Sequence, residues 1–147
     1  MKTVLTILLL AITPLTFAQK KEKQSKKETV TVQEPRKIVM QLTSGDTTVH
    51  KMLMKQLSNI LTVAPDTKIE VVCHGPGLSM LVEAKSIVND KILASKAKGV
   101  DFVACRYSMK ERNVLEAEIN SNARIVEAGI IEIVDRQNEG YVYIKAG

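Results

Sequence analysis

A cysteine between a predicted strand and a predicted helix is the residue in this sequence best suited to covalent chemistry. Residues 100–104 are mostly apolar and suit a strand that is covered on both faces, and Cys105 ends that strand. Ser108 and Glu111 have the spacing of a capping box, which predicts a helix N-terminus just beyond the cysteine. The positive end of a helix and the charge of Arg106 both favour a thiolate, so Cys105 is a candidate nucleophile and Arg106 its stabiliser.

A packing role is the alternative for Cys105, because free cysteine is among the most buried residue types. Cys73 ends an earlier predicted strand, and we expect it to point into the core as a small apolar side chain. A bridge between the two cysteines is not expected. It requires Cα atoms within about 7 Å and facing side chains, whereas parallel strand ends direct such side chains into different layers or along the sheet.

Predicted strands and helices alternate along residues 37–147. The strands are expected at 37–42, 68–73, 100–105, 124–126 and 141–144, and the helices at 47–61, 78–84, 87–98, part of 109–119, and 129–138. This β-α-β-α-β order with short loops predicts an α/β fold, with a mostly parallel sheet and helices on both of its faces.

Chemistry in such folds gathers beyond the carboxyl ends of the strands. Besides Cys105, two loops lie at those ends, namely residues 43–46 and residues 74–77. The candidate pocket residues at this edge are Ser44, Asp46, His74, Gly75, Gly77, Ser108 and Met109. His74 is either a general base for the thiol or a hydrogen-bonded loop anchor, and Asp46 is either a helix cap or a catalytic group.

Other kinds of site lack their signatures in this sequence. His50 and His74 lie far apart, and no Cys-x-x-Cys or His-x-x-x-His spacing occurs, so neither a metal nor a cofactor is expected. The nucleophile elbow Gly-x-Ser-x-Gly and the dinucleotide-binding turn Gly-x-Gly-x-x-Gly are also missing. Two cysteines are too few for a disulfide scaffold.

The net charge of +5 is concentrated near the N-terminus. Residues 1–36 contain seven of the 21 basic and three of the 16 acidic side chains, so residues 37–147 carry 14 basic and 13 acidic ones. The predicted domain is therefore almost neutral and has no basic stripe, which argues against a nucleic-acid partner.

Residues 1–18 have the pattern of a secretory signal peptide. Lys2 precedes an apolar run over 4–15, and the small residues of Thr16-Phe17-Ala18 predict cleavage after Ala18. The run is short for a membrane span, and no other run approaches that length. Residues 19–36 are rich in lysine and poor in large apolar residues, which predicts a flexible charged leader. We therefore expect an exported protein, either periplasmic or secreted.

Residues 37–147 resemble the DsrE/DsrF-like family of small α/β proteins. The similarity rests on residues 72–78, on residues 99–105 with Met109 beyond them, and on residues 137–145. It implies a three-layer α/β/α sandwich with a five-stranded, mainly parallel sheet, and homo-oligomers that are often trimers or hexamers. In the sulfur-relay branch, a cysteine after the third strand carries sulfane sulfur as a persulfide, and Cys105 matches that position.

Two functions fit these observations. The first is an exported carrier or transferase of sulfane sulfur that receives it on Cys105 from a donor protein and passes it to an acceptor protein. The second is a non-enzymatic domain that binds a small ligand or forms an oligomeric scaffold, in which Cys105 is structural.

Overall fold

Within residues 34–147, which are those the computed structural model describes, five parallel strands form one sheet. The strands are β1 (Lys37–Leu42), β2 (Lys68–Cys73), β3 (Asp101–Cys105), β4 (Ala123–Val126) and β5 (Val142–Ala146). Their order across the sheet is β4-β3-β2-β1-β5, and each adjacent pair is parallel. The predicted signal peptide and most of the predicted leader lie outside the described residues.

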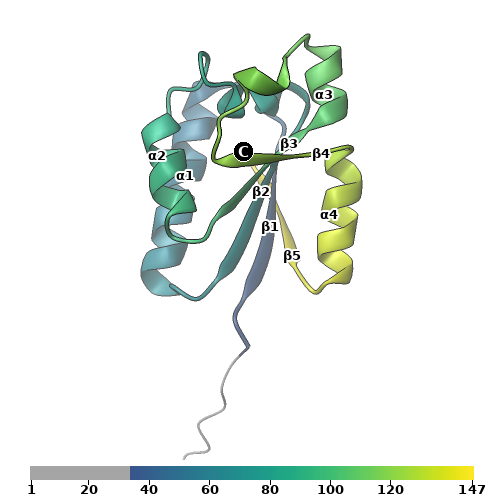
Figure 1. Ribbon diagram of the computed structural model, residues 1–147. Coiled ribbons are helices and arrows are strands. Elements are labelled where there is room, and N and C mark those ends of the chain that lie inside the picture. The colour runs from purple at the N-terminus through teal and green to yellow at the C-terminus, as the bar shows by residue number, and fades with distance from the viewer. Residues whose placement is uncertain (1–33) are drawn as a thin grey trace, which may run out of the picture. The chain divides into compact units, whose positions relative to one another are not determined.

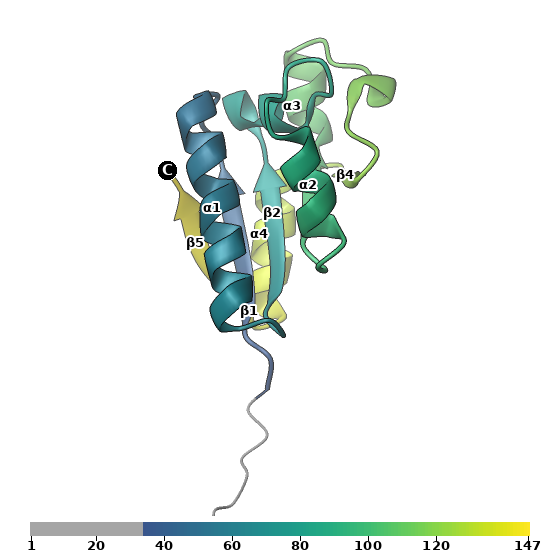
Figure 2. The ribbon, with the colours of Figure 1, turned by 90° about the vertical axis from the view of Figure 1, so that its left-hand side faces the viewer.

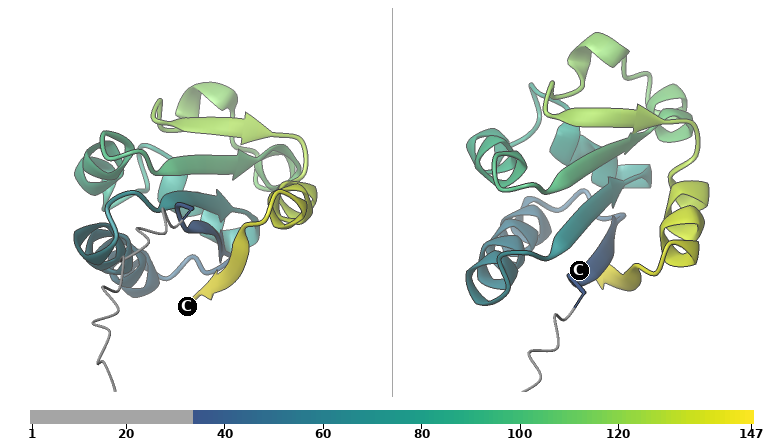
Figure 3. Two further views of the ribbon diagram at one scale, coloured as in Figure 1. Left: turned by 90° about the horizontal axis from the view of Figure 1, so that it is seen from below. Right: turned by 60° about the horizontal axis from the view of Figure 1, so that its bottom comes forward.

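Helices cover both faces of this sheet. The helices are α1 (Thr47–Val63), α2 (Asn89–Lys96), α3 (Arg106–Glu111) and α4 (Gly129–Asn138), and the short 3-10 segments are η1 (Gly75–Leu81) and η2 (Glu116–Glu118). Helices α1 and α2 lie on one face and α4 on the other, while α3 follows the carboxyl end of β3 (Figures 1 and 2). Seen from below, the sheet lies between the helices of its two faces, so these elements form three layers, as expected (Figure 3).

The sequence pattern predicts several elements closely and places others incorrectly. β1, β2 and α4 have the expected bounds. The helix expected at 78–84 is instead η1, which begins at Gly75, where the backbone is left-handed with φ of +53°. The helix expected after Ser108 begins three residues earlier because Cys105 itself has extended backbone and serves as its N-cap. Ser108 therefore lies inside the first turn of α3 and does not cap it.

The apolar core is divided by the sheet into two unequal clusters. The larger one packs α1 and α2 against the sheet and contains Leu53, Leu57, Ile92 and Phe102, all nearly inaccessible to solvent. The cluster beneath α4 contains only Val39, Val72, Val103 and Ile133. Alternation of side chains along each strand separates these two sets, so β2 contributes Val71 to one cluster and Val72 to the other.

Charged side chains complete the contact between α4 and the sheet. Glu70 of β2 is 3 % exposed, and its Oε2 atom lies 2.7 Å from Arg136 Nε and 3.0 Å from Arg124 Nη2. Glu132 of α4 lies 3.0 Å from Arg136, and Asp101 of β3 lies 2.6 Å from Arg124. This α4 charge cluster, formed by these five residues, joins the helix to β2, β3 and β4.

Burial and ion pairing shift the pKa of the Glu70 carboxyl in opposite directions. Desolvation raises the pKa of the Glu70 carboxyl, and although Arg124 and Arg136 counteract part of that increase, the pKa reaches about 7. Its second oxygen, Oε1, is buried without a hydrogen-bond partner among the described residues. The cluster therefore contains a carboxylate whose charge depends on both arginines near neutral pH.

We predict that Arg136→Met destabilises the protein more at pH 8 than at pH 5.5. The pKa of Glu70 is higher in the folded protein than that of an ordinary glutamate, so its ionisation lowers stability as the pH rises through about 7. Loss of one arginine leaves that buried charge less compensated at pH 8, at a cost of about 2 kcal/mol in the free energy of unfolding. Urea denaturation at both pH values measures the difference.

Arg112→Met is the control for this prediction, because Arg112 lies outside the α4 charge cluster and makes no ion pair among the described residues. If Arg136→Met lowered the free energy of unfolding equally at pH 5.5 and pH 8, that result would contradict the conclusion that Glu70 ionises as a buried group near pH 7.

Candidate functional site

Cys105 is the point at which β3 passes directly into α3. Its backbone is extended, with φ of −84° and ψ of 118°, and the first helical residue follows at once. The residue is 5 % exposed and pairs with Val126 of β4 in the sheet register. The thiol is therefore placed at the carboxyl edge of the sheet, as the sequence predicts for this strand.

The N-terminus of α4 supplies a hydrogen bond to this thiol. Gly129 is the first residue of α4, and its backbone N–H donates to Cys105 Sγ over 3.2 Å. A Cβ atom on residue 129 would lie 3.1 Å from Val72 Cγ1 and 3.2 Å from Cys105 Cβ. Such distances are tighter than ordinary packing, so glycine is what allows the backbone of α4 to approach the sulfur this closely.

Several polar groups act together on the ionisation of Cys105. Burial alone raises the pKa of the thiol, but the N–H of Gly129, the backbone and hydroxyl of Ser108 and the N–H of Tyr107 hold the pKa below its ordinary value. Such a group has more thiolate near neutral pH than an ordinary cysteine has, and the thiolate is the nucleophile.

Cys73 has the opposite character. It is fully buried in the larger core cluster, and burial raises the pKa of its thiol far above the ordinary value. Cys73 pairs with Ala104, so it and Cys105 occupy positions of opposite parity and face opposite sides of the sheet. Both cysteines are free thiols in the structure.

Ser108 connects the thiol with the loop that follows β2. Its side chain is buried, and its Oγ atom accepts a hydrogen bond from the Gly75 N–H over 2.8 Å. With its oxygen engaged in this way, the hydroxyl hydrogen is available to the sulfur. The pairing places Gly75 beside the site, as expected from their positions at the sheet edge.

His74 is held by a chain of side chains that leads to the edge of the sheet. The Oε1 atom of Gln41 accepts a hydrogen bond from the Tyr143 hydroxyl, so its amide nitrogen faces His74 Nε2 at 2.7 Å. This arrangement makes Nε2 the acceptor of a neutral imidazole, and burial lowers the pKa of His74. No hydrogen bond joins His74 to Cys105 among the described residues, so its contacts are those of a loop anchor.

The turn after β1 packs against the loop after β2. The Gly77 N–H donates to the Thr43 carbonyl over 3.0 Å, and a Cβ atom on residue 77 would meet Leu42 O at 2.3 Å. The Ser44 carbonyl lies 2.8 Å from Nε2 of the buried His50. Asp46 is the N-cap of α1, because its carboxylate accepts from the Thr48 N–H over 2.7 Å.

Met109, expected in the pocket, and Arg106, expected to stabilise the thiolate, have other surroundings. Met109 lies in the larger core cluster and is 3 % exposed. The Arg106 guanidinium pairs with Glu116 and with Glu127, the latter over 3.1 Å. Stabilisation of the thiolate by Arg106 therefore stays a prediction, whereas the hydrogen bond to the sulfur comes from the Gly129 N–H.

Three residues at the site, Gly129, Gln41 and Tyr143, are not among those predicted from the sequence. Gly129 has a readable signal, because it is a small residue that opens an amphipathic helix shortly after a strand. Gln41 and Tyr143 have none, because nothing in their local sequence shows that β5 returns beside β1.

In residues 34–147, no three His, Cys, Asp or Glu side chains gather in a way that suits a metal ion. The helices of that same region are all too short or too polar to cross a bilayer.

The chain belongs to the DsrE/DsrF-like family, whose model matches residues 37–146. The family associates the chain with a sulfur-relay related role. A similar solved structure is a protein of unknown function, MTH1491 from Methanobacterium thermoautotrophicum. The two share 24 % identity and a TM-score of 0.71, over 75 % of this chain and 98 % of that one, which supports the fold. No curated protein matches the sequence.

We predict that Ser108→Ala shifts the pH profile of Cys105 alkylation to higher pH. The substitution removes the hydroxyl that lowers the pKa of the thiol, so less thiolate is present at pH 7. Iodoacetamide labelling of Cys105, followed by peptide mass spectrometry across pH 5 to 10, gives the profile. We expect a rate at pH 7 about threefold lower and a rate near pH 10 that is unchanged.

Ser79→Ala is the matched control, because that hydroxyl bonds the Pro76 carbonyl in the neighbouring segment and has no contact with the sulfur. Arg106→Ala separates the charge of Arg106 from the contacts of Ser108. If the pH profile of Cys105 alkylation shifted with Arg106→Ala and not with Ser108→Ala, Arg106 and not Ser108 would be the group that lowers the pKa of the thiol.

Proposed function

We propose that this protein carries or transfers sulfane sulfur as a persulfide on Cys105. The observation that carries the proposal is the Gly129 N–H, which opens α4 and lies 3.2 Å from Cys105 Sγ. A backbone donor in that position stabilises the thiolate, which is the form of Cys105 that attacks a donor persulfide. Membership of a family associated with sulfur relay supports the same chemistry.

The proposed loading step is a sulfur transfer between thiols. The Cys105 thiolate attacks the terminal sulfur of a donor persulfide, and a new S–S bond forms as the donor's own S–S bond breaks. The donor leaves as a thiolate, and the proton of the terminal sulfur is lost to solvent or retained on the new persulfide. The acceptor reverses the exchange, so no external oxidant or reductant is consumed.

The small exposure of Cys105 restricts the donor. Cys105 is only 5 % exposed, so a donor sulfur can reach its thiol only if that sulfur protrudes from the surface of the donor protein, as a terminal persulfide does. The loop anchored by His74 and the first turn of α3 border this approach, because Gly75 bonds Ser108. Donor and acceptor proteins are therefore expected to present a protruding persulfide or thiol.

Export and assembly belong to the same proposal. The pattern of residues 1–18 supports a periplasmic or secreted protein, and N-terminal sequencing of the exported chain should then begin at Gln19.

Exposed apolar side chains on α4 and β5 support a homo-oligomer: these are Ile130, Ile131, Val134, Val142 and Ile144. Light scattering should give a multiple of the mature mass, and a monomer would contradict the assembly.

A scaffold or ligand-binding domain with a structural cysteine is the second candidate. Two observations favour it, namely the 5 % exposure of Cys105 and the apolar surface on α4 and β5. In that function the Gly129 hydrogen bond only fixes the start of α4, and the thiol has no chemistry of its own.

We predict that a low-molecular-weight persulfide adds one sulfur atom to Cys105 and leaves Cys73 unchanged. Intact-mass measurement before and after a reductant detects the adduct, and the reductant should remove it. The matched variants are Cys105→Ser, which should lose the adduct, and Cys73→Ser, which should keep it, because Cys73 is fully buried with a raised pKa. Absence of any adduct on the wild type and on Cys73→Ser would favour the scaffold function.

A further inference from the structure

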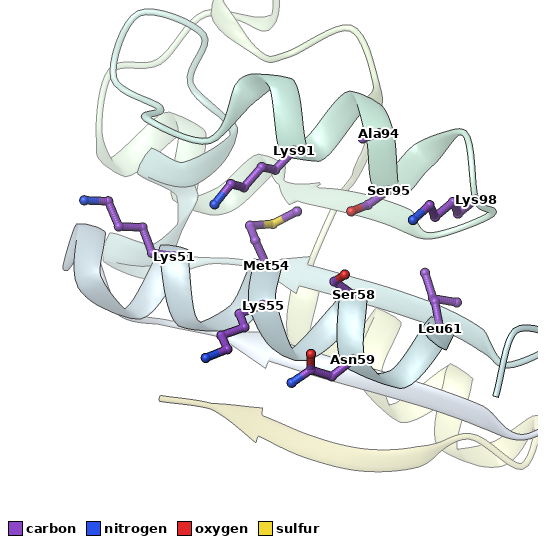
Figure 4. Close-up of a pocket in the computed structure, with 10 residues that line it drawn as sticks. All are labelled: Lys51, Met54, Lys55, Ser58, Asn59, Leu61, Lys91, Ala94, Ser95 and Lys98. Carbon is purple, nitrogen blue, oxygen red and sulfur yellow. The ribbon is translucent and has the colours of Figure 1, made fainter. Parts of the chain in front are cut away.

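A groove of about 520 Å³ separates α1 from α2, on the face of the sheet opposite α4. Its floor includes Met54 and Leu61, which extend from α1 toward α2 (Figure 4). Ser95 extends from α2 toward α1, and Ala94 and Ser58 leave the space between the helices open because their side chains are small. A groove of this volume is of the size that holds small organic ligands.

Positive charge surrounds this groove. Lys51 and Lys55 come from α1, Lys91 comes from α2, and Lys98 follows the end of α2. Lys91 and Lys98 extend into the space between the helices, whereas Lys55 points away from α2 (Figure 4). No acidic side chain lines the groove.

The four lysines have no carboxylate partner within residues 34–147. Lys96 on the same helix differs, because it pairs with Asp101 over 3.0 Å. Ammonium groups that line one groove without counter-ions give it a positive potential, which attracts an anion. The groove therefore combines an apolar floor with charges that lack counter-ions.

We infer that the α1–α2 groove binds an amphipathic organic anion, namely an alkyl chain that ends in a carboxylate. The chain would lie against Leu61 and the exposed Ala94, and the carboxylate would pair with Lys91 or Lys98, whose ammonium groups enter the groove. This site is independent of the Cys105 chemistry, because the groove lies on the other face of the sheet.

A small anion fits the groove better than an acidic helix of a partner protein does. Lys91 and Lys98 enter a space in which Met54 is almost fully buried at 3 % exposure. A partner helix needs a row of accessible apolar anchors, and the groove offers Leu61 as its one large side chain of that kind.

Dodecanoate below its micellar concentration is the probe, and calorimetric titration of the purified protein measures its binding. We expect saturable binding that weakens as salt is added, because exposed charge pairs are screened. Lys91→Glu combined with Lys98→Glu should weaken the affinity about tenfold or more, since two attractions become repulsions. Lys145→Glu, on the exposed strand β5 away from the groove, is the matched charge control and should leave binding unchanged.

Ala94→Trp tests the shape of the groove without changing its charge. Ala94 is exposed, so the larger side chain should fill the groove while the fold is kept, and binding should be lost. Circular dichroism confirms that each variant is folded. Equal binding of dodecyltrimethylammonium, or dodecanoate binding that survives both Ala94→Trp and the double lysine variant, would overturn the inference. Binding of an acidic amphipathic peptide in place of dodecanoate would overturn it in favour of a protein partner.

Discussion

The contact between Gly129 N–H and Cys105 Sγ is the constraint on which the site depends. It requires β3 to end at the sulfur and α4 to begin beside it, although the two residues are 24 positions apart in sequence. It also favours glycine at 129, because a Cβ atom there would lie 3.1 Å from Val72 Cγ1 and 3.2 Å from Cys105 Cβ. The parallel order of β3 and β4 meets the first requirement by carrying the chain back to the same edge of the sheet.

The position of α4 is set by two kinds of interaction that differ in character. Ile133 packs on the valines of β1, β2 and β3, while the α4 charge cluster fixes the helix through Glu70, Arg124 and Arg136. Apolar packing tolerates small shifts, whereas ion pairs with fixed geometry favour one arrangement. We infer that the charge cluster restricts how far the start of α4 can move from the sulfur.

Much of the fold was predictable because its signals are local. Apolar runs and helical periodicity located β1, β2 and α4, and the strand that ends at Cys105 indicated the candidate nucleophile. The remaining features depend on contacts between distant segments. The capping-box spacing of Ser108 and Glu111 is misleading because Cys105 is the N-cap and the helix begins at Arg106. The buried Glu70 has no local signal because its arginine partners lie more than 50 residues away.

The same limit applies to the site. The neighbours of Cys105 in the sequence indicate its position, whereas Gly129 and the Tyr143–Gln41–His74 chain depend on strands and helices that meet only in the folded structure.

The most direct test is a spectroscopic pH titration of the Cys105 thiolate in a Cys73→Ser background. We predict an apparent pKa below the ordinary value of about 8.5 for a free cysteine. An apparent pKa at or above that value would contradict the stabilisation of the thiolate by Gly129 and Ser108.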